Sequence, residues 1–259
     1  MSTLTSYTNA TRPSASSNSG LCIFNTDTDA INVSDGTDWL VYGNDGVNYG
    51  ANDYTVALDG TDDRVEIGNI TSLNSTSAYS ISTWFKSSAT ITSTIDLFAS
   101  GDGYTAGLFF YLTSTGLDSG FDAKYLRYSG NLADGNWKHV VTVYNGSTFV
   151  LYINGSLVTT TNPAGSPASS TSSTSGNGAV IGARVDASRE FEGNIDDFAI
   201  FDAALTTNEV SNIYNSAAYT VSKLQHLYRF ENNYNDTIGS NNGTAQGNPV
   251  LDNTTARPY

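Results

Sequence analysis

The chain has 259 residues, a length that suits one all-β sandwich with a short appendage. Eleven basic residues stand against 25 acidic ones, so the formal net charge is −14. Because phosphate backbones and anionic bilayers repel such a surface, we expect no nucleic-acid or membrane partner. Lys, Glu and Ala are scarce, which disfavours a helical bundle.

Residues 1–19 are rich in Ser, Thr and Asn and predict an arm that is exposed or bound to a partner. The first residues, Met1 to Tyr7, contain neither a basic n-region nor an apolar h-region, so no signal peptide is expected. A virion or extracellular location would then require release by another route, such as lysis. Cys22 lies in an apolar run and is expected to be buried.

Turn dipeptides divide the rest of the chain into short apolar runs. Asp-Gly and Asn-Gly pairs recur, as at Asn145-Gly146, and they tolerate the positive φ angles of hairpin turns. Residues 159–178 are low in complexity and predict a long loop, and residues 252–259 lack strand character. The runs predicted as strands are 54–58, 79–85, 137–144, 149–153 and 195–201.

One short helix is predicted after residue 206. Thr206 and Glu209 have the spacing of a capping box, and Val210, Ile213 and Tyr214 follow at helical spacing. We expect this helix to lie on the surface between strands.

Four segments in order resemble a laminin-G-like domain of the concanavalin A-like lectin/glucanase superfamily. The resemblance covers roughly residues 54–215, and it is carried by 57–67, 79–86, 134–155 and 181–201. It implies an all-β fold, a two-sheet antiparallel jelly-roll sandwich. Trp84 and Trp137 are expected in its core.

The C-terminal part of the chain departs from that family pattern. The segment Leu227 to Asp236, with Ser240 to Thr244, resembles a part that normally comes first in such domains. A truncated second domain is the alternative, but too little chain follows Asn233 for another sandwich. We therefore predict a circularly permuted domain over 46–259, in which 224–250 supplies the displaced first strand.

The N-terminal stretch has its own resemblance. Arg12-Pro13, 20–28 and 31–39 are similar to a β-hairpin of bacteriophage tail-fibre and virion appendage proteins. We expect two strands joined by a turn near Thr26-Asp27. A hairpin alone is marginally stable, so residues 1–45 are predicted to be an attachment segment that contacts other virion proteins. Its expected apolar anchors are Phe24, Ile31, Val33 and Trp39.

Calcium is the cofactor that the resemblance suggests. Asp196 matches an aspartate that holds a structural Ca²⁺ in several superfamily members, together with backbone carbonyls near the first strand. Here those carbonyls would come from Glu231 to Asn233, and Asp236 or Asn242 would complete the oxygen shell. The alternative is that Asp196 caps a turn.

A second acidic group lies earlier in the chain. Asp59, Asp62 and Asp63 offer three carboxylates within five residues, the hard oxygen ligands that Ca²⁺ prefers. Asp-Gly-Thr-Asp-Asp is also a common hairpin turn, and both interpretations stay open.

No enzymatic activity is predicted. Glycoside hydrolysis needs two carboxylates flanking one bond, and the laminarinase-type pattern Glu-x-Asp-x-x-Glu is absent. Glu190 and Glu192 are the nearest pair and are expected to be solvated loop residues. His139 and His226 have no evident catalytic partner, and His139 is expected to stabilise a strand.

Glycan binding uses aromatic faces beside polar groups. Tyr104, Tyr125, Arg127 and Tyr128 flank turns and could form a rim or concave patch, although they could equally be ordinary sandwich residues. The function predicted from sequence is a non-enzymatic phage virion structural protein, a tail fibre, appendage or capsid decoration, that presents this lectin-like sandwich. It is expected to oligomerise, and the sandwich could bind host or environmental glycans. The alternatives are a bacterial calcium-dependent carbohydrate-binding adhesin and, third, a glycan hydrolase.

Overall fold

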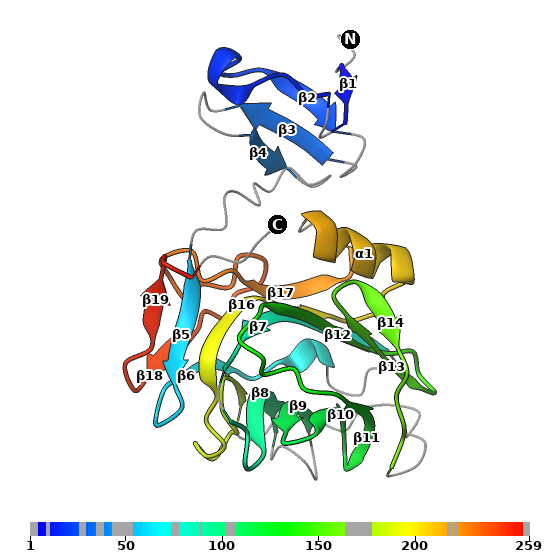
Figure 1. Ribbon diagram of the computed structural model, residues 1–259, viewed down its shortest axis with the longest axis vertical. Coiled ribbons are helices and arrows are strands. Elements are labelled where there is room, and N and C mark those ends of the chain that lie inside the picture. Colours follow the sequence, from blue (N-terminus) through cyan, green and yellow to red (C-terminus); the bar gives the residue numbers. More distant parts are fainter. Residues whose placement is uncertain are drawn as a thin grey trace.

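A computed structural model describes residues 5–8, 11–25, 30–34, 39–42, 54–73, 78–88, 90–101, 107–163, 178–216, 219 and 222–255. Nineteen strands, two short 3-10 helices and one α-helix lie in these ranges. Residues 1–42 contribute a small sheet, and the chain from Tyr54 onward contributes the sandwich (Figure 1). No helix in the described ranges is long and apolar enough to cross a membrane.

The small sheet has four strands in the order β1-β2-β3-β4. They are β1 (Ser6–Tyr7), β2 (Cys22–Asn25), β3 (Ala30–Ser34) and β4 (Trp39–Tyr42), and η1 (Ala15–Ser17) precedes β2. The predicted hairpin is present as antiparallel β2 and β3, but two further strands extend it. Its predicted turn, Thr26-Asp27, lies outside the described residues.

The expected burial of Cys22 is wrong. Cys22 is half-exposed, whereas its neighbour Ile23 is fully buried. Successive side chains of a strand point to opposite faces, so burying Ile23 turns Cys22 to the other side.

Two antiparallel sheets form the sandwich. One has the order β11-β10-β9-β8-β15-β6-β18, and the other β14-β13-β12-β7-β16-β5-β19, with β17 paired to β16. The strands of the first sheet are β6 (Arg64–Gly68), β8 (Ile95–Ser100), β9 (Leu108–Thr113), β10 (Gly116–Phe121), β11 (Lys124–Ser129), β15 (Ala179–Ile181) and β18 (Thr244–Gln246). Those of the second are β5 (Thr55–Asp59), β7 (Tyr79–Lys86), β12 (Lys138–Tyr144), β13 (Phe149–Ile153), β14 (Ser156–Val158), β16 (Glu192–Phe201), β17 (Leu224–Tyr228) and β19 (Val250–Asp252). The short η2 (Thr71–Leu73) follows β6.

The main core fills the space between the sheets. Alternate residues of each strand point inward, as Leu108, Phe110 and Leu112 of β9 do. A second cluster lies on the outer face of the eight-stranded sheet, where Val141 and Val143 pack below α1 (Thr207–Ser216). Figure 1 shows α1 on the side of this sheet away from β8 to β11. This double burial explains why β12 is apolar at nearly every position.

The predicted helix and its capping box are confirmed. The Thr206 backbone N–H donates to Glu209 Oε2 at 2.7 Å, and the Glu209 N–H donates to Thr206 Oγ1 at 3.3 Å. Trp84 is buried beneath the helix and stacks on Tyr214, with 5.4 Å between ring centroids. Trp137 is half-buried, so its predicted place in the core is wrong.

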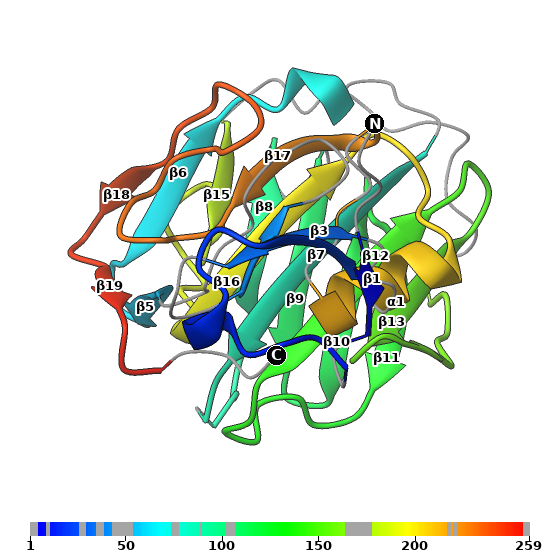
Figure 2. The same cartoon turned by 90° about the horizontal axis from the view of Figure 1, so that it is seen from above.

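The C-terminal segment returns to the strands that begin the sandwich. β18 pairs with β6 and β19 pairs with β5, and both views show these four strands together (Figures 1 and 2). The placement agrees with a segment that completes the domain from its far end, and circular permutation itself stays a prediction. Of the predicted loop 159–178, residues 164–177 lie outside the described ranges.

Candidate functional site

A polar cavity of about 500 Å³ opens where three loops of the sandwich meet, and we call it the rim pocket. Its volume lies within the usual range for small-molecule sites, about 300–1,000 Å³. The turn between β5 and β6, the approach to β8 and the loop before β16 supply its walls. The lining residues are Gly60, Ser93, Thr94, Ile95, Arg189 and Glu190. Hydroxyl, guanidinium and carboxylate groups therefore converge on one space.

The β5–β6 turn is held by its own aspartates. Asp59 Oδ1 accepts the Thr61 N–H at 2.8 Å, and Asp63 Oδ2 accepts the Asp59 N–H at 3.1 Å. Gly60 has φ +74°, and a Cβ there would lie 2.9 Å from the Cβ of Glu192. The position therefore requires glycine both for its backbone conformation and for its close neighbour.

Three carboxylates gather on this turn, and we call them the Asp triplet. One oxygen from each of Asp59, Asp62 and Asp63 lies within 4.8 Å of the others. Asp59 and Asp62 are exposed, whereas Asp63 is buried and also accepts the Asn248 N–H at 2.6 Å. A carboxylate has about four acceptor positions, so these bonds orient the group and leave capacity for a cation. The donor set fits Ca²⁺.

Arg189 links the rim pocket to the outer face of the seven-stranded sheet. Its Nη1 lies 3.8 Å from Asp96 Oδ1, and its guanidinium carbon lies 5.8 Å from the centre of the Tyr111 ring. The Asp96 N–H donates to the Arg189 carbonyl at 2.8 Å, which fixes the loop to β8. Arg189 has φ +57°, a left-handed conformation uncommon outside glycine.

Asp96 is 1% exposed. Burial raises its pKa to about 7, although Arg189 and Arg184 lower it and Asp186 raises it further. The carboxyl therefore titrates near neutral pH, directly behind an arginine that lines the pocket.

Sequence reasoning missed most of the pocket. Ser93 and Thr94 stand in a Ser/Thr-rich stretch that carried no distinguishing signal. Glu190 was expected to be solvated, but it is half-buried and lines the pocket. Glu192 is exposed and is not among the lining residues, so the two glutamates do not line the cavity as a pair.

The predicted glycan patch is divided between two faces of β11. Tyr125 and Arg127 share one face, where Arg127 lies over the Tyr125 ring and forms two hydrogen bonds, of 2.8 and 2.6 Å, with buried Asp118. Tyr128 packs against the main core from the other face. Tyr104 lies outside the described residues. Glycan binding by these residues stays a prediction.

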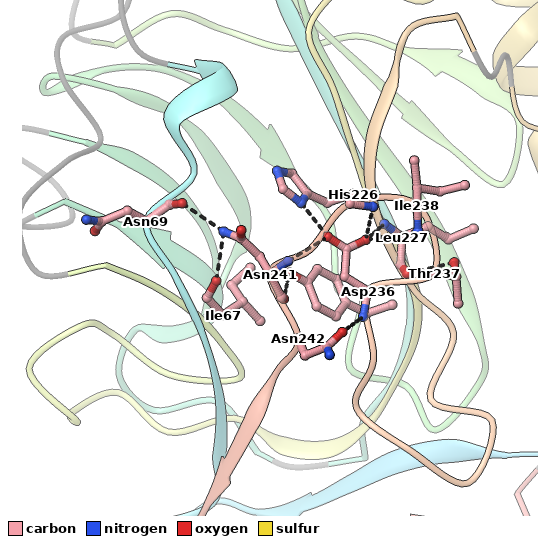
Figure 3. A network of polar contacts seen from close by, with 11 residues as sticks. Ile67, Asn69, His226, Leu227, Asp236, Thr237, Ile238, Asn241 and Asn242 are labelled. Carbon is pink, nitrogen blue, oxygen red and sulfur yellow. Dashed lines mark hydrogen bonds and ion pairs between the residues drawn. The ribbon is translucent and has the colours of Figure 1, made fainter.

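Among the predicted calcium ligands, Asp236 is at the centre of a hydrogen-bond network (Figure 3). Its Oδ1 accepts backbone N–H groups of Leu227, Ile238 and Gly239 at 3.0–3.2 Å. Its Oδ2 lies 2.6 Å from His226 Nδ1 and accepts the Asn241 N–H at 3.3 Å. Burial raises the pKa of Asp236, but the His226 contact and the backbone donors outweigh it, and the pKa lies below its ordinary value.

The other predicted ligands also have partners within the protein. Asn242 Oδ1 accepts the Asp236 N–H at 3.1 Å. Asn233 donates from Nδ2 to the Glu231 carbonyl at 2.7 Å. Asp196 is fully buried, and its Oδ1 accepts the Asp197 N–H at 2.7 Å, a contact of the kind that the turn-cap alternative predicted.

Both histidines have polar partners within the protein. Besides the His226–Asp236 contact, His139 Nε2 lies 2.9 Å from Ser82 Oγ. Ser82 and His139 are fully buried under α1, and the His139 ring lies 5.0 Å from the Trp84 ring. No substrate reaches a serine and histidine covered in this way, so the pair stabilises the strands.

The fold places the protein in a class of two-sheet antiparallel sandwiches. More specifically, the chain belongs to the concanavalin A-like lectin/glucanases superfamily, whose family model matches residues 59–211, more than half of its length. No curated protein sequence matches the chain.

Solved structures share the fold at low identity. A Bacteroides ovatus protein that is assigned a carbohydrate-binding role superposes with a TM-score of 0.61 at 15% identity, over 77% of this chain and 60% of that one. A heptameric SAP-like pentraxin from Limulus polyphemus superposes with a TM-score of 0.50 at 18% identity, over 77% of this chain and 94% of that one. At these identities the likeness shows the fold alone. The chain spans 60% of the length of the Bacteroides protein.

Proposed function

We propose that this chain is a non-catalytic carbohydrate-binding protein and that the rim pocket receives the sugar. The main support for this proposal is that Ser93, Thr94, Arg189 and Glu190 line one polar cavity. Sugar hydroxyls both donate and accept hydrogen bonds, and this set supplies donors and an acceptor. The family and the role assigned to the Bacteroides ovatus protein support the proposal.

Arg189 is the residue that best tests the pocket. Binding to an array of immobilised oligosaccharides is measured for the wild-type protein and for Arg189→Met. Losing a charged donor in a binding site typically costs about 1.5–3 kcal/mol, so we expect a roughly tenfold or greater loss of affinity for the glycans that bind.

Arg184→Met is the matched control. Arg184 lies in the same loop, forms a 3.8 Å ion pair with Asp186 and is not among the pocket residues. This variant should bind as the wild type does. Equal losses in both variants, or no binding of any glycan by the wild type, would refute the rim pocket as the sugar site.

We also propose that the Asp triplet holds Ca²⁺ beside this pocket. Gly60 lines the pocket and stands on the turn that carries the triplet, so a bound ion would stiffen one wall. The ion would supply a positive charge for sugar hydroxyls. This proposal favours the calcium-dependent adhesin alternative over the virion role.

The attachment role of residues 1–45 remains a proposal without a supporting relative, because neither solved structure named above is described as a virion protein. Deleting 1–45 should leave a folded sandwich that no longer assembles with itself or with particle proteins, as sedimentation would show. An oligomer that survives the deletion contradicts this role. Location outside a cell or on a particle is likewise proposed, and immunolabelling of particles and culture supernatant tests it.

A further inference from the structure

We propose that Arg229 takes the place of a calcium ion where the C-terminal segment joins β16. We call this place the C-terminal junction: it is the ion pair of Arg229 with Asp197, next in sequence to the predicted calcium ligand Asp196 and close in sequence to Glu231. The superfamily resemblance predicts a metal there, but the side chains present supply their own positive charge. This inference is independent of the carbohydrate site.

The strand pairing brings the two charges together. β17 runs antiparallel to β16 with Phe198 opposite Tyr228, so Asp197 and Arg229 come side by side one residue further on. Arg229 Nε lies 3.1 Å from Asp197 Oδ1. The two side chains are 7% and 0% exposed, so the ion pair is withdrawn from water.

Electrostatics makes this guanidinium a substitute for a metal ion. A buried carboxylate needs a counter-charge, because leaving water costs several kcal/mol. Arg229 supplies that charge to Asp197 from within the chain. A divalent cation bound beside it would be repelled by the guanidinium, in surroundings that screen the repulsion poorly.

Other predicted calcium ligands already form hydrogen bonds within the protein. Ca²⁺ takes about six to eight oxygens. The two carboxylate oxygens of Asp236 accept four backbone N–H groups, and Oδ2 also contacts His226, which fills the acceptor positions of this carboxylate. Asn242 Oδ1 accepts the Asp236 N–H. The Glu231 carbonyl accepts from Asn233. These oxygens of Asp236, Asn242 and Glu231 therefore hold the C-terminal segment together.

The backbone at and near the ion pair adopts left-handed conformations. Asp197, Phe230 and Asn232 have φ values of +42°, +57° and +56°. Such conformations are uncommon for non-glycine residues and persist where surrounding contacts determine them. Asp197 is the β16 member of the ion pair, and Phe230 and Asn232 follow Arg229 just beyond the end of β17.

The test uses the full chain with Asp59→Asn and Asp62→Asn, so that the Asp triplet cannot contribute a calcium signal. Thermal unfolding is followed with added EDTA and with added millimolar Ca²⁺. We expect the same Tm in both. In the same background, Arg229→Met should lower the Tm by about 10 °C, because buried Asp197 loses the positive charge of its ion pair.

The Arg229→Met protein should then gain stability from Ca²⁺, because the guanidinium that repels a cation from Asp197 is gone. Arg64→Met is the control: Arg64 pairs with half-exposed Glu66 at 3.0 Å, and its loss should change the Tm little and create no calcium response. If Arg229→Met does not fold, Arg229→Lys retains the charge and should fold without any calcium response.

If EDTA lowers the Tm of the protein that carries only Asp59→Asn and Asp62→Asn, the proposal is overturned. An Arg229→Met protein that keeps its Tm, or that Ca²⁺ does not stabilise, would also overturn it, as would a calcium-responsive Arg229→Lys. These outcomes are separate from the glycan measurements, so either proposal can fail alone.

Discussion

The β5–β6 turn and the C-terminal segment both place aspartates in tight turns, yet the two regions treat the carboxylate differently. Asp236 is buried and receives four backbone N–H groups and a histidine. Asp59 and Asp62 are exposed, and Asp59 receives one backbone N–H on its turn. An aspartate that is buried and accepts several N–H donors stabilises the fold, whereas an exposed aspartate with one donor can still bind a ligand.

The largest effect should follow removal of the Asp236 carboxylate. Asp236→Ala leaves buried backbone donors and His226 without their acceptor, and we expect a loss of about 5 kcal/mol in the free energy of unfolding. Urea denaturation measures it. Asp134→Ala is the control, because exposed Asp134 pairs with Lys138 at the surface and should cost less than about 1 kcal/mol. Similar losses of unfolding free energy in the two variants would show that buried Asp236 contributes no more to stability than exposed Asp134 does.

Asp96 is buried, as Asp236 is, but its carboxylate forms an ion pair with Arg189 at 3.8 Å and is not surrounded by backbone N–H donors as Asp236 is. Its pKa therefore rises to about 7, whereas that of Asp236 falls. Between pH 4 and 7 the folded chain keeps a proton that the unfolded chain loses. Stability attributable to this group is thus present at low pH and is lost as pH rises toward its folded-state pKa.

Asp96→Asn should remove this loss. At pH 8 the variant should be more stable than the wild type, by at most about 4 kcal/mol from the pKa difference, and the gain should shrink toward pH 4. Denaturation curves collected across this pH range test the sign. A variant that is less stable at pH 8, or a gain independent of pH, would show that Asp96 is ionised at no cost.

The smallest effect on stability is expected at the Asp triplet. Asp62→Asn changes an exposed side chain and should alter the free energy of unfolding without calcium by less than about 0.5 kcal/mol. It should nevertheless abolish the rise in Tm that we expect Ca²⁺ to give the wild-type protein. Asp134→Asn should keep that rise. A calcium response of equal size in the wild type and in Asp62→Asn would contradict the proposal that the Asp triplet binds Ca²⁺.

Much of the sandwich could be predicted because its strands are locally recognisable. The run 79–85 begins by alternating and then turns apolar, and 137–144 is apolar at nearly every position and ends at Asn145-Gly146. The capping box predicted α1. β10 could not be recognised, since Gly116 to Phe121 contains two glycines, a serine and an aspartate. That sequence becomes a buried strand because Arg127 on β11 neutralises Asp118 across the sheet.

The site was harder to predict because its contacts are distant in sequence. The Asp triplet lies within one turn and was recognised as one of two interpretations. Arg189 reaches the pocket through a left-handed backbone conformation, and its neighbour Asp96 is on another strand. Arg229 meets Asp197 across 32 residues, so the ion pair became visible only once β17 was placed beside β16.

Anomalous diffraction from crystals soaked in a lanthanide, which binds the same hard oxygen ligands as Ca²⁺, tests most directly where this protein accepts a cation. We predict a peak between the carboxylates of Asp59, Asp62 and Asp63, and none between Asp196 and Glu231. A peak at the C-terminal junction, or an Asp triplet without one, would contradict the account.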